Sequence, residues 1–574
     1  MTHSAHVSGT PGGGHGHAVV IGSSLAGLTA ARALANFMDH VTVIDRDWMP
    51  HGPARRRGVP QARHTHTLTH TAQQGLQQLF PHITADLEAA GAVRVHPGED
   101  LLVLGPAGWL PRTATGQGHL SASRDLIDAV LRERLRAEPK VTFLPRHEAV
   151  GLEGGPHDTV TGVWIRPLTH PHTTATAPER RLISADFVID ASGRDSHAPQ
   201  WLADLGYRTP KETVTETHAS FATAVFAPPV GHVADFTALL LTPAPGHPAQ
   251  GTLSPIEGGR WSVTVTTADH RPAPADHAAL LRAAGTLRHP LLRDLIAAAT
   301  PLGPVYRATA TASRWRHYEK LRRFPDQFLV VGDAYAALHP VHGQGMTRAI
   351  SDALVLDQLL TAHDTAIGLG YRLRRALARQ LTPAWRATTR AQHAAQDPTT
   401  PTTATTTSAP TTSTAATEAT ASTTSPTPTA TTAAPTAPPA PEATAPPQTA
   451  APRPTLRARL AARLSRRLAA RLAAAATTDA RAAALLLQQL QPADAPAARP
   501  RLWRAALRGA RAAAYPAPTA PPSTTHGPHT RRRRTPAPDT PAARALTGAA
   551  RQRTTPAARP QGPHTSPAGD RRRP

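Results

Sequence analysis

Apolar runs separated by glycine-containing turns divide the first part of the chain into strands and helices. Residues 18–21 form a short apolar run typical of a buried strand, and residues 28–37 place apolar side chains at helical spacing. A second apolar strand is predicted at 41–44 and an amphipathic helix at 123–138. Strands that alternate with helices favour a parallel sheet covered by helices.

Residues 213–270 follow a different pattern, because apolar and polar side chains alternate along segments such as 220–227 and 260–267. This period of two predicts half-buried antiparallel sheet. After a helical region at 275–300 the chain returns to a buried strand at 328–331. We therefore predict an α/β fold: a Rossmann-like domain with an inserted mixed or antiparallel β-sheet domain, followed by C-terminal helices and disordered segments.

The C-terminal third has a composition of its own. Residues 398–454 are almost entirely Thr, Ala, Pro and Ser, which cannot bury enough apolar area to fold, so we expect a linker. Leucines recur every four residues from Leu456 to Leu472 among arginines and predict a basic amphipathic helix. We favour packing of this helix on the main body over binding to a membrane surface.

The net charge of +23 is concentrated in that region, where residues 398–574 carry 24 Arg and 6 acidic residues. Only three lysines accompany the arginines, which indicates a GC-rich coding bias rather than a function. The absence of cysteine excludes thiolate metal sites and cysteine nucleophiles, so redox chemistry would need a cofactor. The sequence has no signal-peptide pattern and no apolar run near the ~18 residues of a transmembrane segment, so we expect a cytoplasmic protein.

A glycine-containing turn, from Gly22 to Gly27, connects the first strand to the first helix. Such a turn brings backbone N–H groups at a helix N-terminus close to a pyrophosphate. Asp45 ends the second strand about 20 residues further on, where an acid binds a ribose hydroxyl. Ser24 occupies the position of the fingerprint's middle glycine. Strand, turn, helix, strand and acid together predict dinucleotide binding.

The strand predicted at 328–331 is followed by Asp333 and by a loop with Pro340, Gly343 and Gly345 before the next helix. Asp333 can accept a hydrogen bond from a sugar hydroxyl. Backbone N–H groups of the glycine turn can approach an anion or an electron-rich ring. An ordinary strand-to-helix loop is the alternative for this segment alone.

The sequence leaves the roles of two further positions undecided. Arg63 or His64, in a basic loop broken by glycine and proline, lies near phosphates or a cofactor ring, or else belongs to a solvated helix start. Metal binding by His64, His66 and His70 is disfavoured because no carboxylate lies at ligand spacing. Arg124, at the start of the predicted helix 123–138, either reaches the cofactor or is solvated.

The motifs GSSLAG, VIDRD, RRGVPQARHTH, SRDLIDAVLRERL, DASGRDS and FLVVGDAYAALHPVHGQGM together resemble the FAD-dependent aromatic hydroxylase-like (para-hydroxybenzoate hydroxylase-like) monooxygenases. The similarity is greatest to the bacterial natural-product branch that includes polyether epoxidases. It runs from about residue 18 to residue 395 and, more weakly, through 455–514. The expected domains are a disordered N-terminus (1–16), an FAD-binding domain (17–200 and 301–396), a substrate-binding sheet domain (201–300, with residues near 68–112), a linker (397–454), a helical region (455–514) and a disordered tail (515–574).

This resemblance implies that Gly22, Ser24 and Gly27 cradle the FAD pyrophosphate and that Asp45 binds the adenosine ribose. Where many aromatic hydroxylases have an Asp-Gly pair, this chain has Ser192-Gly193, with Asp190 two residues earlier. The complete set of cofactor-binding residues expected from the resemblance is Gly22, Ser23, Ser24, Ala26, Gly27, Asp45, Arg46, Arg63, Arg124, Asp190, Gly193, Gly332, Asp333, Pro340, Gly343, Gly345 and Met346.

The resemblance also implies the activity: hydroxylation or epoxidation of a hydrophobic small molecule with O2, through a flavin C4a-hydroperoxide and with NAD(P)H as electron donor. The cofactor carries this chemistry, so we expect no catalytic acid, base or metal, and a largely apolar sheet face over the flavin. A reductase or dehydrogenase of the same fold is the main rival, whereas a halogenase is disfavoured because the W-x-W-x-I-P signature is absent. Specific nucleic-acid binding by the tail is disfavoured, since Tyr515 is its only aromatic residue after residue 514.

Overall fold

The computed structural model describes residues 16–112, 118–168, 179–215, 219–267, 272–308, 312–340, 343–362, 367–396 and 469–490. The expected disordered N-terminus, except residue 16, the linker, the tail and most of the 455–514 region lie outside the described residues.

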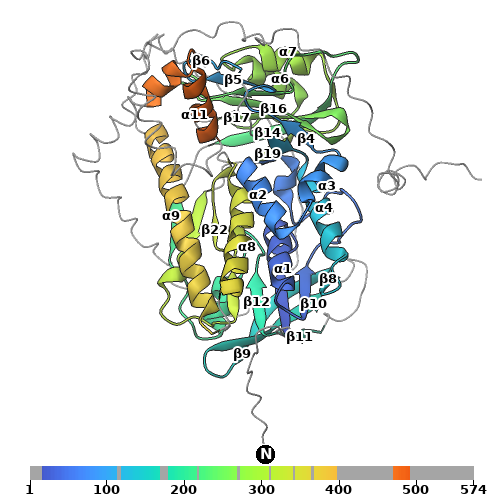
Figure 1. Ribbon diagram of the computed structural model, residues 1–574, viewed down its shortest axis with the longest axis vertical. Coiled ribbons are helices and arrows are strands. Elements are labelled where there is room, and N and C mark those ends of the chain that lie inside the picture. Colours follow the sequence, from blue (N-terminus) through green and yellow to red (C-terminus); the bar gives the residue numbers. More distant parts are fainter. Residues whose placement is uncertain are drawn as a thin grey trace, which may run out of the picture.

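A five-stranded parallel sheet forms the centre of the larger domain (Figure 1). One side is covered by α1 (Leu25–Ala35), α4 (Arg124–Arg136) and α8 (Gly345–Ala362), with α2 (His70–Leu79) beside α8. The strand order is β21 (Phe328–Val330), β12 (Phe187–Asp190), β1 (His17–Ile21), β2 (His40–Asp45) and β8 (Val141–Pro145). A three-stranded sheet of β9 (His147–Gly155), β10 (Thr159–Pro167) and β11 (Arg181–Ser184) packs near β2 and β12.

A second, eight-stranded sheet forms the other domain. Its path is β18 (Thr300–Pro301), β14 (Ser220–Ala227), β17 (Arg260–Thr267), β16 (Gln250–Ile256), β15 (Ala238–Leu241), β5 (Leu101–Gly105) and β6 (Gly108–Trp109), with β19 (Tyr306–Ala308) paired to β14. Residues 101–109 therefore supply two strands from within the part of the sequence expected to form the FAD-binding domain. The predicted α/β fold with an inserted sheet is confirmed.

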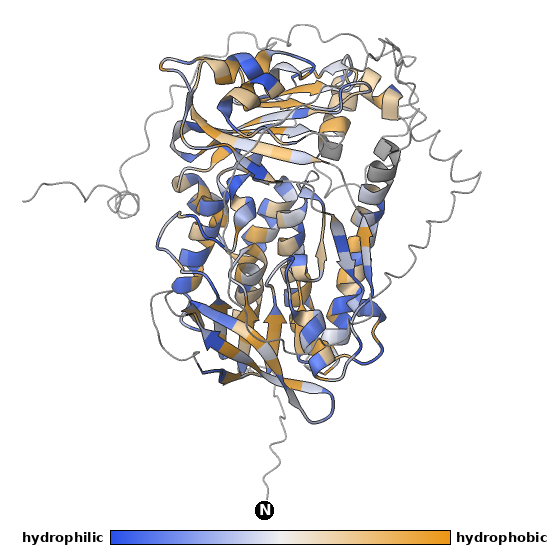
Figure 2. Cartoon of the chain, turned by 180° about the vertical axis from the view of Figure 1, so that it is seen from behind, coloured by the Kyte–Doolittle hydropathy of each residue, from blue (hydrophilic) through white to orange (hydrophobic). Residues whose placement is uncertain are grey.

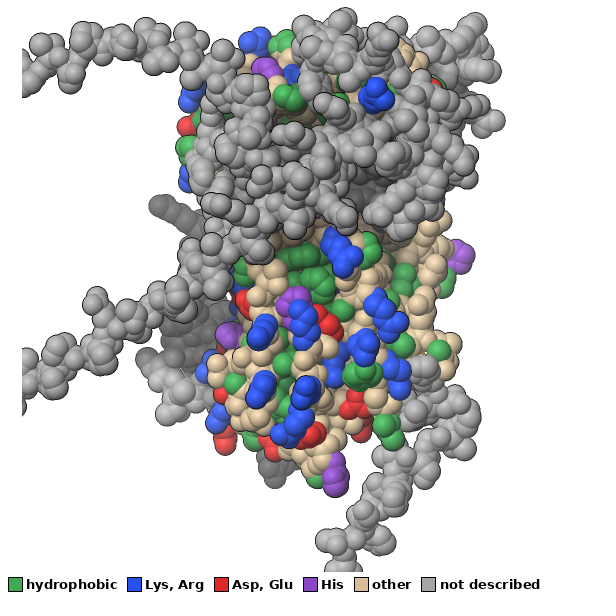
Figure 3. Space-filling view, turned by 90° about the vertical axis from the view of Figure 1, so that its left-hand side faces the viewer, with side chains coloured by type: hydrophobic (Ala, Val, Ile, Leu, Met, Phe, Trp, Pro, Cys, Tyr) green, Lys and Arg blue, Asp and Glu red, His purple; other side chains and the backbone are tan. Residues whose placement is uncertain are grey.

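Smaller elements complete the described part of the fold. They are a sheet of β3 (Thr67–Leu68), β7 (His119–Ser121) and β4 (Val93–Val95), a sheet of β13 (Glu212–Thr215), β20 (Ser313–Arg316) and β22 (Ala336–Ala337), and the helices α3 (Ile83–Ala89) and α5 (Ala198–Asp204). The long helix α9 (Leu369–Gln396) buries its leucines in the core, and basic side chains, among them the exposed Arg375, Arg379 and Arg386, gather on its outer face (Figure 3). Among the described residues, no helix is both long and apolar enough to cross a bilayer.

The two faces of the eight-stranded sheet differ in polarity, as the alternating colours of its strands in Figure 2 illustrate. Val263 and Val265 pack in an apolar cluster with α6 (His277–Gly285) and α7 (Leu291–Ala297). Because strand side chains alternate, Ser262, Thr264 and Thr223 point to the opposite face. The expectation of a largely apolar face there is wrong for the central strands, which present hydroxyl groups.

The C-terminal segment 469–490 completes the β5–β15 end of that sheet. Leu472, from the helical residues that precede α11 (Ala480–Leu490), and Leu487, from α11 itself, are buried against Val103 and Leu110 in a separate apolar cluster. The described part of the amphipathic region thus packs on the main body, as we favoured.

We expect Leu472→Asp to lower the free energy of unfolding by at least about 2 kcal/mol, because a charge replaces a buried apolar side chain. Ala480→Asp adds the same charge at an exposed position of the same segment and should leave stability nearly unchanged. Urea unfolding of both variants tests the packing, and equal stabilities would contradict it.

Candidate cofactor site

Close backbone approaches shape the turn between β1 and α1. Gly22 has a φ of +99°, and a Cβ there would lie 2.6 Å from the carbonyl oxygen of Ala191. A Cβ on Gly27 would lie 1.8 Å from the carbonyl oxygen of Gly22. Only glycine fits at either position, so the start of α1 lies tight against the ends of β1 and β12. Backbone N–H groups at such a helix N-terminus are suited to bind a ligand's phosphates.

Ser24 is the N-cap residue of α1, yet its side chain does not cap the helix. Its hydroxyl accepts a hydrogen bond of 2.8 Å from Nη2 of Arg124, on α4. Arg124 is also paired with Asp128 at 2.7 Å and is 5% exposed. The structure therefore places Arg124 at the predicted pyrophosphate cradle of Gly22, Ser24 and Gly27. Ser24, which replaces the middle glycine of the fingerprint, contacts Arg124 directly.

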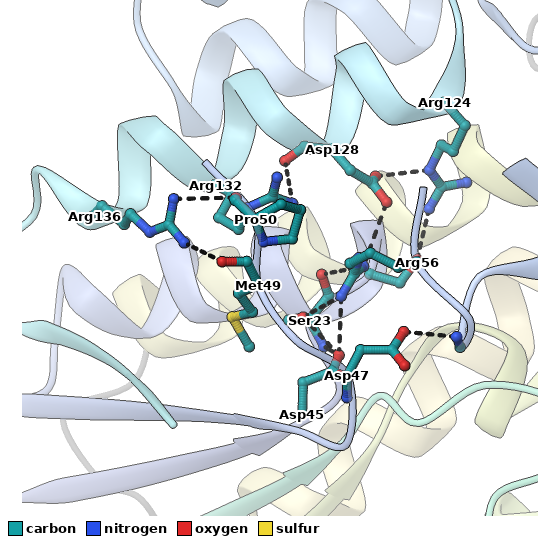
Figure 4. A network of polar contacts seen from close by, with 12 residues as sticks. Ser23, Asp45, Asp47, Met49, Pro50, Arg56, Arg124, Asp128, Arg132 and Arg136 are labelled. Atoms are coloured by element: carbon teal, nitrogen blue, oxygen red, sulfur yellow. Dashed lines mark hydrogen bonds and ion pairs between the residues drawn. The ribbon is translucent and has the colours of Figure 1, made fainter. Parts of the chain in front are cut away.

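Asp45, at the end of β2, holds the next part of the cradle (Figure 4). Its Oδ2 accepts hydrogen bonds from the backbone N–H and the hydroxyl of Ser23, at 2.7 and 2.6 Å. Its Oδ1 accepts one from the N–H of Asp47 at 2.7 Å. Oδ1 keeps a lone pair for one further donor, which suits a ribose hydroxyl.

Arg56 is a residue of this site that the sequence reasoning missed. Its guanidinium donates to Oδ2 of Asp45 at 3.2 Å, and to the hydroxyl and the carbonyl oxygen of Ser23 at 2.7 and 3.0 Å. It also lies 3.6 Å from the carboxylate of Asp128 (Figure 4). Nothing in the run Arg55-Arg56-Arg57 distinguishes the buried arginine from its neighbours; only its 6% exposure does.

Asp333 follows β21 on the other side of β1. The guanidinium of Arg194 lies 3.6 Å from its Oδ2, and the side chain keeps 39% of its accessible surface. Crowding by protein raises the pKa of the Asp333 carboxyl, against the opposing effects of Arg194, Arg348 and Arg124. Asp333 and Arg124 are thus close enough to interact, and the carboxylate remains reachable from solvent.

Asp190 ends β12, and Gly193 lies in the turn that follows this strand. Asp190 is fully buried, and its oxygens accept hydrogen bonds from the N–H and hydroxyl of Ser192 and from the hydroxyl of Ser196. Burial raises the pKa of this carboxyl. Gly193 has a φ of +90° with no atom near its missing Cβ, so it is selected for turn geometry. The structure gives Asp190 a role in holding the turn together.

The other predicted residues fall into three groups. Ser23, Ala26 and Gly332 belong to the cradle, since a Cβ on Gly332 would lie 2.7 Å from Cβ of Ala26. Pro340, Gly343, Gly345 and Met346 lie at the start of α8, where the N–H of Gly343 donates to the carbonyl oxygen of Pro340. Arg46 is exposed, and Arg63 stacks over the ring of Tyr306 in the sheet domain rather than joining the cradle.

We expect Arg56→Met to cost about 3–5 kcal/mol of unfolding free energy, because it leaves the carboxylates of Asp45 and Asp128 buried without this partner. Arg57→Met removes the same charge from the exposed neighbour and should change stability by less than about 0.5 kcal/mol. Denaturant titrations of the two variants make the comparison; a small effect at Arg56 would show that the cluster is not a structural centre.

The comparisons with known proteins agree with this geometry. A protein family described as an FAD binding domain matches residues 16–391. Protein Rv3254 of Mycobacterium tuberculosis is 35% identical over 392 residues, which cover 66% of this chain and 80% of that protein. A kynurenine 3-monooxygenase of Salinispora tropica is 28% identical over 363 residues, 60% of this chain and 72% of that protein.

Solved structures share the fold. PqsL, a probable FAD-dependent monooxygenase from Pseudomonas aeruginosa, superposes with a TM-score of 0.50 at 17% identity, over 66% of this chain and 95% of that one. The myxobacterial chondrochloren halogenase CndH gives the same TM-score at 16% identity, over 66% and 82% of the two chains. The match to residues 16–391 shows that this chain belongs to the FAD binding domain family.

Proposed function

We propose that the protein binds FAD non-covalently and oxygenates a small organic molecule, with NAD(P)H as electron donor and O2 as co-substrate. The observation that supports this proposal is that the N-terminus of α1, Asp45 and Asp333 all lie at the carboxyl ends of the parallel strands. Pyrophosphate fits against Ser24 and Arg124, and an adenosine ribose fits Oδ1 of Asp45. FAD, when bound, supplies the redox chemistry that activates O2.

The chain's own residues position the reactants and exclude water. Backbone groups from Gly343 to Met346, at the start of α8, are the donors for the pyrimidine end of the cofactor ring in this proposal. In this proposal the substrate lies beside the hydroxyl-bearing face of the eight-stranded sheet, whose central hydroxyls are covered by His64 and Thr65. Hydroxylation or epoxidation in natural-product biosynthesis is the finer assignment we favour, supported by the sequence resemblance. A reductase or dehydrogenase of the same fold is the alternative.

Asp333 provides a sharp test of the cofactor assignment. Loss of one hydrogen bond to a charged group costs about 1.5–3 kcal/mol, so Asp333→Ala should weaken FAD binding roughly 10- to 100-fold. Asp294→Ala removes a carboxylate that is 53% exposed on α7 and should not change the affinity. Fluorescence titration of apoprotein with FAD measures both. Equal affinities would remove Asp333 from the site.

Oxygen insertion is tested separately from cofactor binding. The holoprotein, reduced with NAD(P)H and exposed to ¹⁸O2 with extract of a strain that lacks the gene, should add one ¹⁸O atom to a metabolite detected by mass spectrometry. A product that differs from its precursor only by two hydrogens would support the reductase or dehydrogenase alternative and contradict oxygenation.

A further inference from the structure

Residues 63–66 link the cofactor cradle to the hydroxyl-bearing sheet face. At one end, burial and the nearby Arg124 guanidinium lower the pKa of His66 to about 4. At the other, the Thr65 hydroxyl lies 2.9 Å from the hydroxyls of both Ser262 and Thr264 on β17. A group presented by this segment therefore lies between the site proposed for FAD and the face proposed for the substrate.

His64 is held on this segment through one of its two ring nitrogens. Its Nδ1 lies 2.9 Å from Oγ1 of Thr223, which is fully buried. Thr223 contacts Thr264 at 2.7 Å, and Thr264 contacts Thr65 at 2.9 Å. If Nδ1–H donates to Thr223, each hydroxyl in the row can donate to the next, so the row has a consistent direction.

In that arrangement Nε2 of His64 is a hydrogen-bond acceptor, and within the described part of the chain no hydrogen bond reaches it. The imidazole is half-buried. Burial, and then the charge of Arg63, lower the pKa of His64, which keeps the ring neutral near pH 7 and its Nε2 able to accept. A donor group on a bound molecule is the partner this atom lacks.

The phenyl ring of Phe221, which is 8% exposed, packs near the imidazole of His64. The ring of Phe221 on β14 is 6.4 Å from that of His64 and 5.8 Å from that of His339. His339 precedes Pro340, whose carbonyl begins the turn leading to Gly343 and α8. The acceptor and the phenyl ring thus lie beside the segment proposed to face the flavin, which suits a planar ring bearing a hydroxyl group.

The other titratable or charged groups around His64 are few. His66 lies on the same segment and His339 lies across Phe221. Tyr306, paired with Thr223 across β14 and β19, carries the guanidiniums of Arg55 and Arg63 over its ring, each at 4.9 Å. An anionic substrate would pair with Arg63 rather than donate a hydrogen bond to His64. The test therefore includes an anionic probe.

We propose that His64 is a specificity-determining residue that accepts a hydrogen bond at Nε2 from a hydroxyl group of a planar aromatic substrate, while Thr223 orients its ring. This inference deepens the proposed function and rests on it. It adds a hydrogen-bonding requirement to a site that the sequence alone indicated as apolar.

The test compares three probes of one ring system, 1-naphthol, 1-methoxynaphthalene and 1-naphthoate, by equilibrium dialysis against the holoprotein. We expect 1-naphthol to bind about tenfold more tightly than the ether, which cannot donate to Nε2. His64→Leu should abolish that ratio and Thr223→Val should reduce it, whereas the control His70→Leu should preserve it. Lowering the pH should also close the gap in the wild type, because protonated His64 cannot accept.

Each contrary result is informative. Equal binding of alcohol and ether by the wild type, or an unchanged ratio in His64→Leu, would overturn the role of His64. Preferred binding of 1-naphthoate that is lost in Arg63→Met would assign the position to anion recognition, and binding of no probe would overturn the aromatic substrate class. FAD content, measured on the same samples, separates these outcomes from failure of the proposed function, which absent FAD would indicate.

Discussion

The buried contact between the Arg56 guanidinium and the carboxylates of Asp45 and Asp128 is the interaction on which the site depends. It joins the end of β2, the turn after β1 and helix α4. Charges so deeply buried are stable only when each has its partners. The cluster therefore fixes the orientation of Asp45 and, through Asp128, of Arg124, before any ligand arrives.

A second constraint comes from the alternation of side chains in the eight-stranded sheet. One face is covered by α6 and α7, and the other is divided between the α11 segment, over β5 and β15, and the hydroxyls of β14 and β17. The row from His64 to Thr65 ties that face to the cofactor-binding domain. In the proposed function, the sites for cofactor and substrate are thereby linked through one short segment of the chain.

The sequence predicted what depends on local pattern. Gly22, Gly27 and Asp45 follow from spacing along a strand, turn, helix and strand, and the inserted sheet follows from alternation. Arg56 could not be found, because burial among three consecutive arginines is decided by tertiary contacts. The sequence also could not predict that the hydroxyl-bearing face of the sheet meets the other domain. Alternation in RWSVTVTT separates two faces but does not say which one packs against α6 and α7. The two-residue strands β3 and β22 carry no periodic signal at all.

The stoichiometry of FAD binding tests the central claim most directly. After dialysis of the full chain against excess FAD and removal of free cofactor, the absorbance of flavin released by unfolding gives the number of FAD molecules per chain. The arrangement of Asp45, Arg124 and Asp333 around one helix N-terminus predicts one, released without proteolysis because no covalent link is expected. Protein that remains colourless, with no flavin released, would contradict the account.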